Sequence, residues 1–320
     1  MQTNLTQPYY GTDDNIAQKF DSEPLRCVHS GAAVLSHIYV TLGSTTRHFD
    51  WQNTSPMPQN KTSTHTNQVV TVSFTDPAQE EAALAFARQH HLACREEPRH
   101  IDTPLYLCFT PDRLELRETQ TDNAIYVDFT AGAVAHRRRF GGGRGQTIAK
   151  AVGLKQGRNP KVLDATAGLG RDSFVLASLG CSVTLVERSP IVHALLLDGI
   201  KRGILNGETG IILKQHFDLI LGDAIHIMET LPQNQKPAVI YLDPMYPVRR
   251  KSAKVKKEMQ LLQQLLGHQN DVPGLLSSAL MCAQQRVVVK RPKGAPPVDG
   301  PLPSFCIESK STRFDVYVTG

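Results

Sequence analysis

The chain has 320 residues, of which 40% are hydrophobic and 20% charged, and its formal net charge is +5. This content suffices for one large α/β domain with a smaller one. No apolar run approaches the ~20 residues that span a bilayer, and no secretory signal is recognisable, so we expect a cytoplasmic protein without a membrane segment. The six cysteines show no CxxC pair and no histidine at ligand spacing, which predicts reduced thiols and no metal site.

Residues 1–68 are predicted to be an N-terminal extension, a polar linker or a partly disordered segment. Between Trp51 and Gln68 there is no Val, Ile or Leu, while Thr, Asn, Gln and Pro dominate. Such a stretch cannot bury enough apolar surface to offset the entropy lost on ordering.

A small α+β domain is predicted over residues 69–145. Asp76 and Pro77 provide an N-cap and a first-turn proline for a helix that ends near His90. Strand-like runs follow at 105–109, 114–117 and 124–129.

Residues 146–320 alternate between short apolar runs and helical patterns, with helices predicted at 172–179 and from Ser189 to about Gly203. Repeated βαβ units predict a doubly wound, mostly parallel, Rossmann-like sheet, in which ligands lie at the carboxyl ends of the strands. The last two runs predict a terminal antiparallel pair. The expected strands are 161–165, 182–186, 219–221, 239–242, 286–289, 304–308 and 313–318.

The first candidate site is the strand, glycine turn and helix at residues 162–172, with the sequence VLDATAGLGRD. Gly168 and Gly170 would let the backbone approach a bound nucleoside closely. Ser173 replaces the third glycine of the dinucleotide fingerprint. On its own, this motif is equally compatible with an ordinary tight turn.

Two acids end the next two strands. Glu187 is placed to accept hydrogen bonds from both hydroxyls of a ribose, and Asp223 is suited to an adenine amino group. Glu187 alone is more often a solvated charge at a strand end, and a dehydrogenase uses a similar carboxylate.

The fourth strand ends in Asp243, Pro244, Met245 and Tyr246, which together are typical of chemistry on an amine. The lone pair of a nucleobase or amide amine is delocalised, so the nitrogen attacks poorly. The carboxylate of Asp243 and the carbonyl of Pro244 would accept its hydrogens and stabilise the positive charge that develops. Tyr246 would stack on the base. These three residues are the catalytic candidates.

Together the four motifs resemble the class I S-adenosylmethionine-dependent methyltransferases, and the fourth resembles the (D/N/S)PP(Y/F/W) box of amino methyltransferases. Met245 departs from the second proline of that box. Asp-Pro-Met before an aromatic residue resembles instead the small-subunit ribosomal RNA guanine-N2 methyltransferase J family of bacteria. The resemblance covers roughly residues 105–318, with matching blocks at 127–132, 135–145, 164–172, 251–259 and 286–292.

This resemblance implies a class I methyltransferase fold, S-adenosylmethionine as cofactor, and methylation of one guanosine N2 amine near the 3′ end of 16S ribosomal RNA. The expected partner is ribosomal RNA or the small ribosomal subunit. With the first motif included, the implied cofactor-binding residues are Asp164, Gly168, Gly170, Arg171, Asp172, Glu187, Arg188, Asp223, Ala224 and Asp243.

Two basic clusters flank the predicted amine site and favour binding to RNA phosphates, although a solvated face would also explain them. The first contains Arg137, Arg138, Arg139 and Arg144, and the second contains Arg249, Arg250, Lys251, Lys254, Lys256 and Lys257.

Three alternatives stay open from the residues alone. The same chemistry would serve cytosine N4, adenine N6 or a protein glutamine. A nicotinamide-dependent oxidoreductase would leave the Asp243 motif unexplained. An RNA-binding protein with an inactive nucleotide pocket would not be expected to keep both Glu187 and Asp243.

Overall fold

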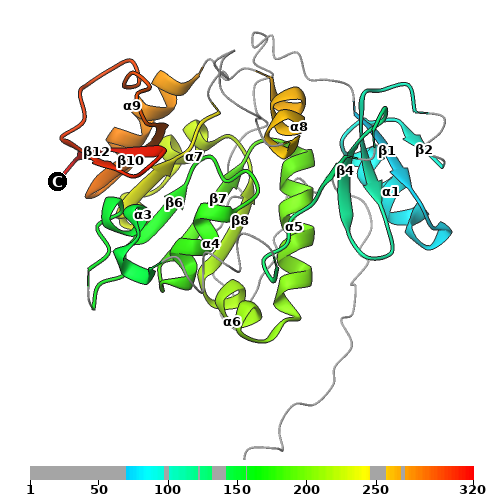
Figure 1. The fold of residues 1–320 in the computed structure, drawn as a ribbon, viewed down its shortest axis with the longest axis horizontal. Coiled ribbons are helices and arrows are strands. Elements are labelled where there is room, and N and C mark those ends of the chain that lie inside the picture. The colour runs from blue at the N-terminus through cyan, green and yellow to red at the C-terminus, as the bar shows by residue number, and fades with distance from the viewer. Residues whose placement is uncertain are drawn as a thin grey trace, which may run out of the picture. The chain divides into compact units, whose positions relative to one another are not determined.

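The computed structural model describes residues 70–96, 101–121, 123–131, 142–155, 157–245, 257–267 and 271–320, so the predicted extension 1–68 lies outside it. These residues form two sheets, of five and seven strands (Figure 1). None of the helices in these ranges has the length and apolar character needed to cross a membrane.

The five-stranded sheet has the order β2-β1-β3-β4-β5. β1 runs parallel to β2 and β3, and β4 pairs antiparallel with β3 and β5. Helix α1 (Glu80–Gln89) follows the short turn η1 (Pro77–Gln79) and packs Ala83 and Ala87 against β1. The strands are β1 (Thr71–Phe74), β2 (Cys94–Arg95), β3 (Leu105–Phe109), β4 (Leu114–Glu118) and β5 (Ala124–Ile125).

One expected strand of this region is shorter than predicted. The run at 124–129 pairs with β4 only over β5, and a side-chain turn follows at Asp128. The carboxylate of Asp128 accepts hydrogen bonds from the backbone N–H groups of Thr130 at 2.7 Å and Ala131 at 3.3 Å. Val127 and Phe129, on either side of Asp128, are buried in the core of the second sheet.

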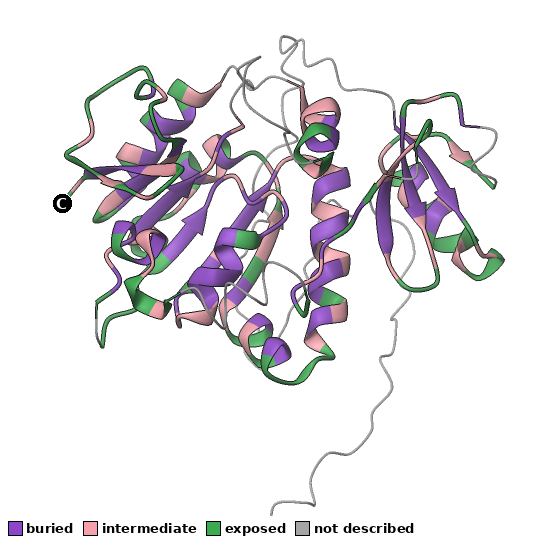
Figure 2. Cartoon of the chain, viewed as in Figure 1, coloured by how far each residue is buried: buried purple, intermediate pink, exposed green. Residues whose placement is uncertain are grey.

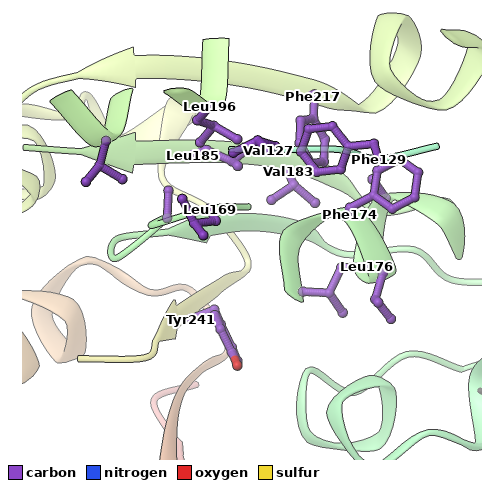
Figure 3. Packing of buried hydrophobic residues seen from close by; sticks show 14 of the residues in the cluster. Val127, Phe129, Leu169, Phe174, Leu176, Val183, Leu185, Leu196, Phe217 and Tyr241 are labelled. Carbon is purple, nitrogen blue, oxygen red and sulfur yellow. The ribbon is translucent and has the colours of Figure 1, made fainter. Parts of the chain in front are cut away.

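The segment after β5 packs closely on helix α5 (Pro190–Ile204). A Cβ on Gly199 would lie 2.4 Å from Cγ1 of Val127, so this helix position requires glycine. The guanidinium of Arg202 donates to the carbonyl of Val127. Phe129 stacks on Phe174, with ring centroids 4.9 Å apart, in an aromatic group that Figure 3 shows. The connecting segment is therefore part of the core.

The seven-stranded sheet has the order β11-β12-β10-β9-β6-β7-β8. β12 runs antiparallel to β10 and β11, and the other strands are parallel. The predicted doubly wound α/β sheet with a terminal antiparallel pair is thereby confirmed. The strands are β6 (Lys161–Asp164), β7 (Ser182–Glu187), β8 (Phe217–Leu221), β9 (Val239–Leu242), β10 (Arg286–Pro292), β11 (Phe305–Glu308) and β12 (Thr312–Val318).

Helices cover both faces of this sheet, and its central strands are buried (Figure 2). Alternate strand residues point to opposite faces, so Val162 and Tyr241 pack with α3 to α6, and Leu163 and Ile240 pack with α7 and α9. The remaining bounds are α3 (Thr147–Ala151), α4 (Arg171–Ser178), α6 (Gly207–His216), α7 (Ala224–Thr230), α8 (Lys257–Leu266), α9 (Val272–Cys282), η3 (Gly143–Gly145) and η4 (Gln233–Gln235).

Candidate active site

A cavity of about 320 Å³ lies at the carboxyl ends of β6, β7 and β9 and beside the start of α7. The strand order reverses here, because β6 is flanked by β7 on one side and β9 on the other, and ligands of doubly wound sheets bind at such points. All the predicted cofactor-binding residues except Gly170 line this cavity: Asp164, Gly168, Arg171, Asp172, Glu187, Arg188, Asp223, Ala224 and Asp243.

The two glycines of the turn after β6 differ in position. Both have positive φ, 53° at Gly168 and 69° at Gly170, which glycine adopts without strain. Gly168 lines the cavity. Gly170 is the N-cap of α4 and faces the core, where a Cβ would lie 2.8 Å from Cδ1 of Leu196 and 3.2 Å from Cζ of Phe129. Its glycine is therefore explained by packing.

Glu187 is a buried carboxylate held by the backbone. Oε2 accepts from the N–H of Gly168 at 2.9 Å, and Oε1 accepts from the N–H of Ser189 at 2.8 Å. Burial raises the pKa of Glu187, and these two amides oppose the rise. The carboxylate is thus fixed in the cavity wall beside the glycine turn.

Asp223 follows β8 and caps helix α7. Its Oδ1 accepts from the backbone N–H of His226 at 3.0 Å, which satisfies a free donor of the first turn. This bond orients the side chain at the cavity wall. The capping role also explains an acid at this position without a ligand.

Asp164 is completely buried at the end of β6. Its Oδ2 accepts from Oγ of Ser173 at 2.5 Å, and its Oδ1 accepts from the N–H of Thr166 at 3.1 Å. Burial raises the pKa of Asp164 to about 7, against these hydrogen bonds. Oγ1 of Thr166 in turn accepts from the N–H of Asp243 at 2.6 Å, so the turn after β6 positions the backbone after β9.

Asp243 belongs to a chain of charged and polar groups. Nζ of Lys290 lies 2.7 Å from Oδ2 of Asp243 and 2.8 Å from Oδ2 of Asp172. The hydroxyl of Tyr241 donates to that same Asp172 oxygen at 2.6 Å. Neither Lys290 nor Tyr241 was predicted from the sequence as a site residue. Lys290 follows three valines on β10, but only the pairing of β10 with β9 brings it beside Asp243.

The two cavity arginines pair with acids that sequence reasoning also missed. Arg171 lies 2.6 Å from Oε1 of Glu258, near the start of α8, and Arg188 lies 2.5 Å from Oδ2 of Asp271, before α9. All four residues line the cavity. The two pairs attach α8 and α9 to its wall.

The acceptor motif and the basic clusters are described only in part. Pro244 is buried, and Met245 lines the cavity. Of the basic clusters, Arg144 donates to the carbonyl of Lys155 at 2.7 Å, and Lys257 is exposed at the start of α8. Tyr246, Arg137, Arg138, Arg139, Arg249, Arg250, Lys251, Lys254 and Lys256 lie outside the described residues.

The described part of the chain contains no recognisable metal-binding site. There, no group of three or more His, Cys, Asp or Glu side chains is arranged to hold a metal ion.

Comparison with known proteins identifies the family of this chain. The family model described as "Putative SAM-dependent methyltransferase" matches residues 87–319. Ribosomal RNA small subunit methyltransferase J of Aeromonas salmonicida is 58% identical over 214 residues, covering 66% of this chain and 85% of that protein. The protein of the same name from Aeromonas hydrophila is 53% identical over 249 residues, covering 77% and 97%.

A solved structure is also similar. The SAM-dependent methyltransferase NGO1261 of Neisseria gonorrhoeae aligns with a TM-score of 0.63 and 39% identity, covering 78% of this chain and 96% of that one. These matches exclude the oxidoreductase alternative. The chain is an S-adenosylmethionine-dependent methyltransferase and belongs to the ribosomal RNA small subunit methyltransferase J family.

Proposed function

We propose that this enzyme methylates the exocyclic N2 amine of one guanosine in small-subunit ribosomal RNA. The observation that carries the proposal is the position of Asp243, which directly follows β9 and lines the same cavity as Glu187. A carboxylate suited to an amine and a carboxylate suited to a ribose thus share one cavity. The names of the relatives supply the RNA, and the resemblance of the Asp243 motif supplies the guanine.

The residues present fit S-adenosylmethionine. The cavity volume of about 320 Å³ is within the range of small-molecule sites, roughly 300–1,000 Å³. Gly168 leaves its wall open, since a Cβ there would meet only the carbonyl oxygen of Thr166, at 3.8 Å. Glu187 would accept from the ribose hydroxyls and Asp223 from the adenine amine. The cofactor supplies a methyl group carried on a positively charged sulfur.

The chain itself would activate the amine. Asp243 and the carbonyl of Pro244 accept the two hydrogens of the amine, which favours a tetrahedral nitrogen with a localised lone pair. The charge of Asp243 also stabilises the positive nitrogen as the new N–C bond forms. Tyr246 stacks on the ring of the base and holds its amine toward the cavity.

RNA would approach across the two basic clusters. The N2 amine of guanine lies at the paired edge in a helix, so the target base must be unpaired or turned out of its stack. Arginines 137–139 and lysines 254, 256 and 257 would then contact phosphates on either side of the base. The enzyme would act in the cytoplasm on ribosomal RNA or the small subunit.

The test is to delete the gene, digest the small-subunit RNA and compare its modified nucleosides by mass spectrometry. We expect one N2-methylguanosine to disappear and to return with the intact protein, but not with Asp243→Ala. Loss of a methylated cytosine or adenine instead would refute the guanine assignment. Unchanged RNA with a demethylated protein glutamine would refute the RNA substrate.

A further inference from the structure

Lys290 joins two cavity carboxylates into one array. Its ammonium lies 2.8 Å from Asp172, on the first turn of α4, and 2.7 Å from Asp243, at the end of β9. Tyr241, fully buried on β9, donates to Asp172 from the other side. Side-chain exposure rises from 10% at Asp172 to 38% at Asp243. The array therefore leads from the core to the open part of the cavity.

Charge is unevenly distributed in this array. Asp172 and Asp243 are two carboxylates on one ammonium. Burial raises the pKa of Asp164, and the charges of these two carboxylates help to raise it further. The Arg171–Glu258 pair of α4 and α8 lines the same cavity and is neutral overall. Burial disfavours the charge of Lys290, but Asp243 and Asp172 outweigh burial and raise its pKa. Lys290 is thus held as a cation.

We propose that Lys290 is a positioning residue for methyl transfer, which fixes the rotamer of Asp243 and keeps that carboxylate ionised beside Asp172. The inference rests on the proposed role of Asp243 toward the amine. Like charges disfavour ionisation of a carboxyl group, and a cation within about 4–6 Å favours it by about 1–3 pH units. Without the ammonium, Asp243 would hold a proton at a higher pH and would no longer accept from the amine.

The test measures kcat and KM against pH for the full-length enzyme, with small subunits from the deletion strain as substrate. Lys290→Met should move the acidic limb of kcat/KM up by about one pH unit or more, because that limb reports the free enzyme's essential groups. At neutral pH kcat should fall, while KM for the subunit and the Kd for S-adenosylmethionine change little. If Lys290 only supported the fold, its substitution would lower the fraction of active enzyme but would not move the acidic limb of the kcat/KM profile.

Asp172→Asn is the opposite variant. It keeps the shape of the side chain and a hydrogen-bond acceptor for Tyr241, and it leaves Lys290 with one carboxylate. The acidic limb should therefore move to lower pH. The double variant Lys290→Met with Asp172→Asn removes one charge of each sign, so its limb should return toward that of the wild type. Asp172→Asn, which keeps Lys290, tests the charge coupling even if Lys290→Met folds poorly.

The outcomes separate this proposal from the proposed function. If the wild type methylates the guanosine and both Lys290→Met and Asp172→Asn keep its acidic limb, the role of Lys290 is refuted. A limb that stays shifted in the double variant also refutes it, because charge balance is then not the cause. If the wild type gives no N2-methylguanosine on these subunits, the proposed function fails first, whatever the variants do.

Discussion

The two ends of the cavity hold their carboxylates differently. At the cofactor end, Glu187 is fixed by two backbone N–H groups, from Gly168 and Ser189. At the acceptor end, Asp243 is held by the side chain of Lys290 and by the Thr166 hydroxyl on its backbone N–H. The position of a carboxylate that is held by backbone N–H groups depends on the turn alone. The position of one that is held by side chains depends on partners from several elements. We therefore expect substitutions at the acceptor end to lower turnover, and substitutions at the cofactor end to weaken the binding of S-adenosylmethionine.

The largest effect is expected from Asp243→Asn. The variant keeps the shape of the side chain but loses the charge that stabilises the positive nitrogen, so turnover should fall by about 10²-fold or more. The measurement is the rate of methyl transfer to small subunits of the deletion strain. The Kd for S-adenosylmethionine, measured by calorimetry, should rise less than it does in a Glu187 variant. Near-normal turnover would show that another group accepts the amine.

For Glu187→Ala, the larger change should be in the Kd for S-adenosylmethionine. It removes a charged hydrogen-bond partner of the ribose, a loss of roughly 1.5–3 kcal/mol, or about ten- to hundredfold in affinity. Calorimetry on the folded variant checks this, and thermal unfolding without cofactor shows whether the glycine turn has survived. Unchanged affinity in a folded protein would mean that the ribose is bound elsewhere.

Elements that depend on their own residues were predicted from the sequence, and elements that depend on a distant partner were not. The seven-stranded sheet was predicted because its strands are apolar runs that end in turn residues. The sequence patterns did not predict β1 and β2. β1 has four residues that are all buried, so it shows no alternation, and β2 has two residues and exists only as a partner of β1. Such a short strand has no periodicity of its own.

In the site, Glu187, Asp223 and Asp243 were predicted because each directly follows or ends an apolar run. Lys290 was not, because its place depends on register. Val289 of β10 pairs with Leu242 of β9, which brings the next residues of both strands, Lys290 and Asp243, together. Two runs that are far apart in sequence do not reveal their mutual register. The proposed roles of the site residues stay predictions until the variants are measured.

Asp164 lies between the two ends and predicts a pH dependence of stability. Its pKa in the folded protein, about 7, exceeds the ordinary value of 3.8, so the folded state binds more protons between these values. Its stabilising contribution is complete below about pH 4 and is lost as pH rises through 7. For this group alone, the unfolding equilibrium constant should rise by at most about tenfold per pH unit within that window.

The measurement for Asp164 is urea unfolding of the wild type and Asp164→Asn without cofactor, at several values between pH 4 and 8. The wild type should lose more stability than the variant as pH rises. Glu187 is also buried with a raised pKa, and Glu115 has a lowered one, but both are present in the two proteins and cancel in the difference. Parallel stability curves would show that Asp164 is ionised in the folded state throughout.

The smallest effect is expected from Lys257→Gln, at the exposed start of α8 and outside the residues that line the cavity. If Lys257 contacts an RNA phosphate, its loss should lower the slope of log affinity against log salt by about 0.7 to 0.9. Lys201→Gln, on the exposed last turn of α5, is the matched control and should leave the slope unchanged. Neither variant should alter the Kd for S-adenosylmethionine. An unchanged slope in Lys257→Gln would refute a phosphate contact at this position. Lys257 would then act within the protein, where hydrogen bonds from Thr121 and Asn123, and after them the charge of Lys257, lower the pKa of Glu118 of β4.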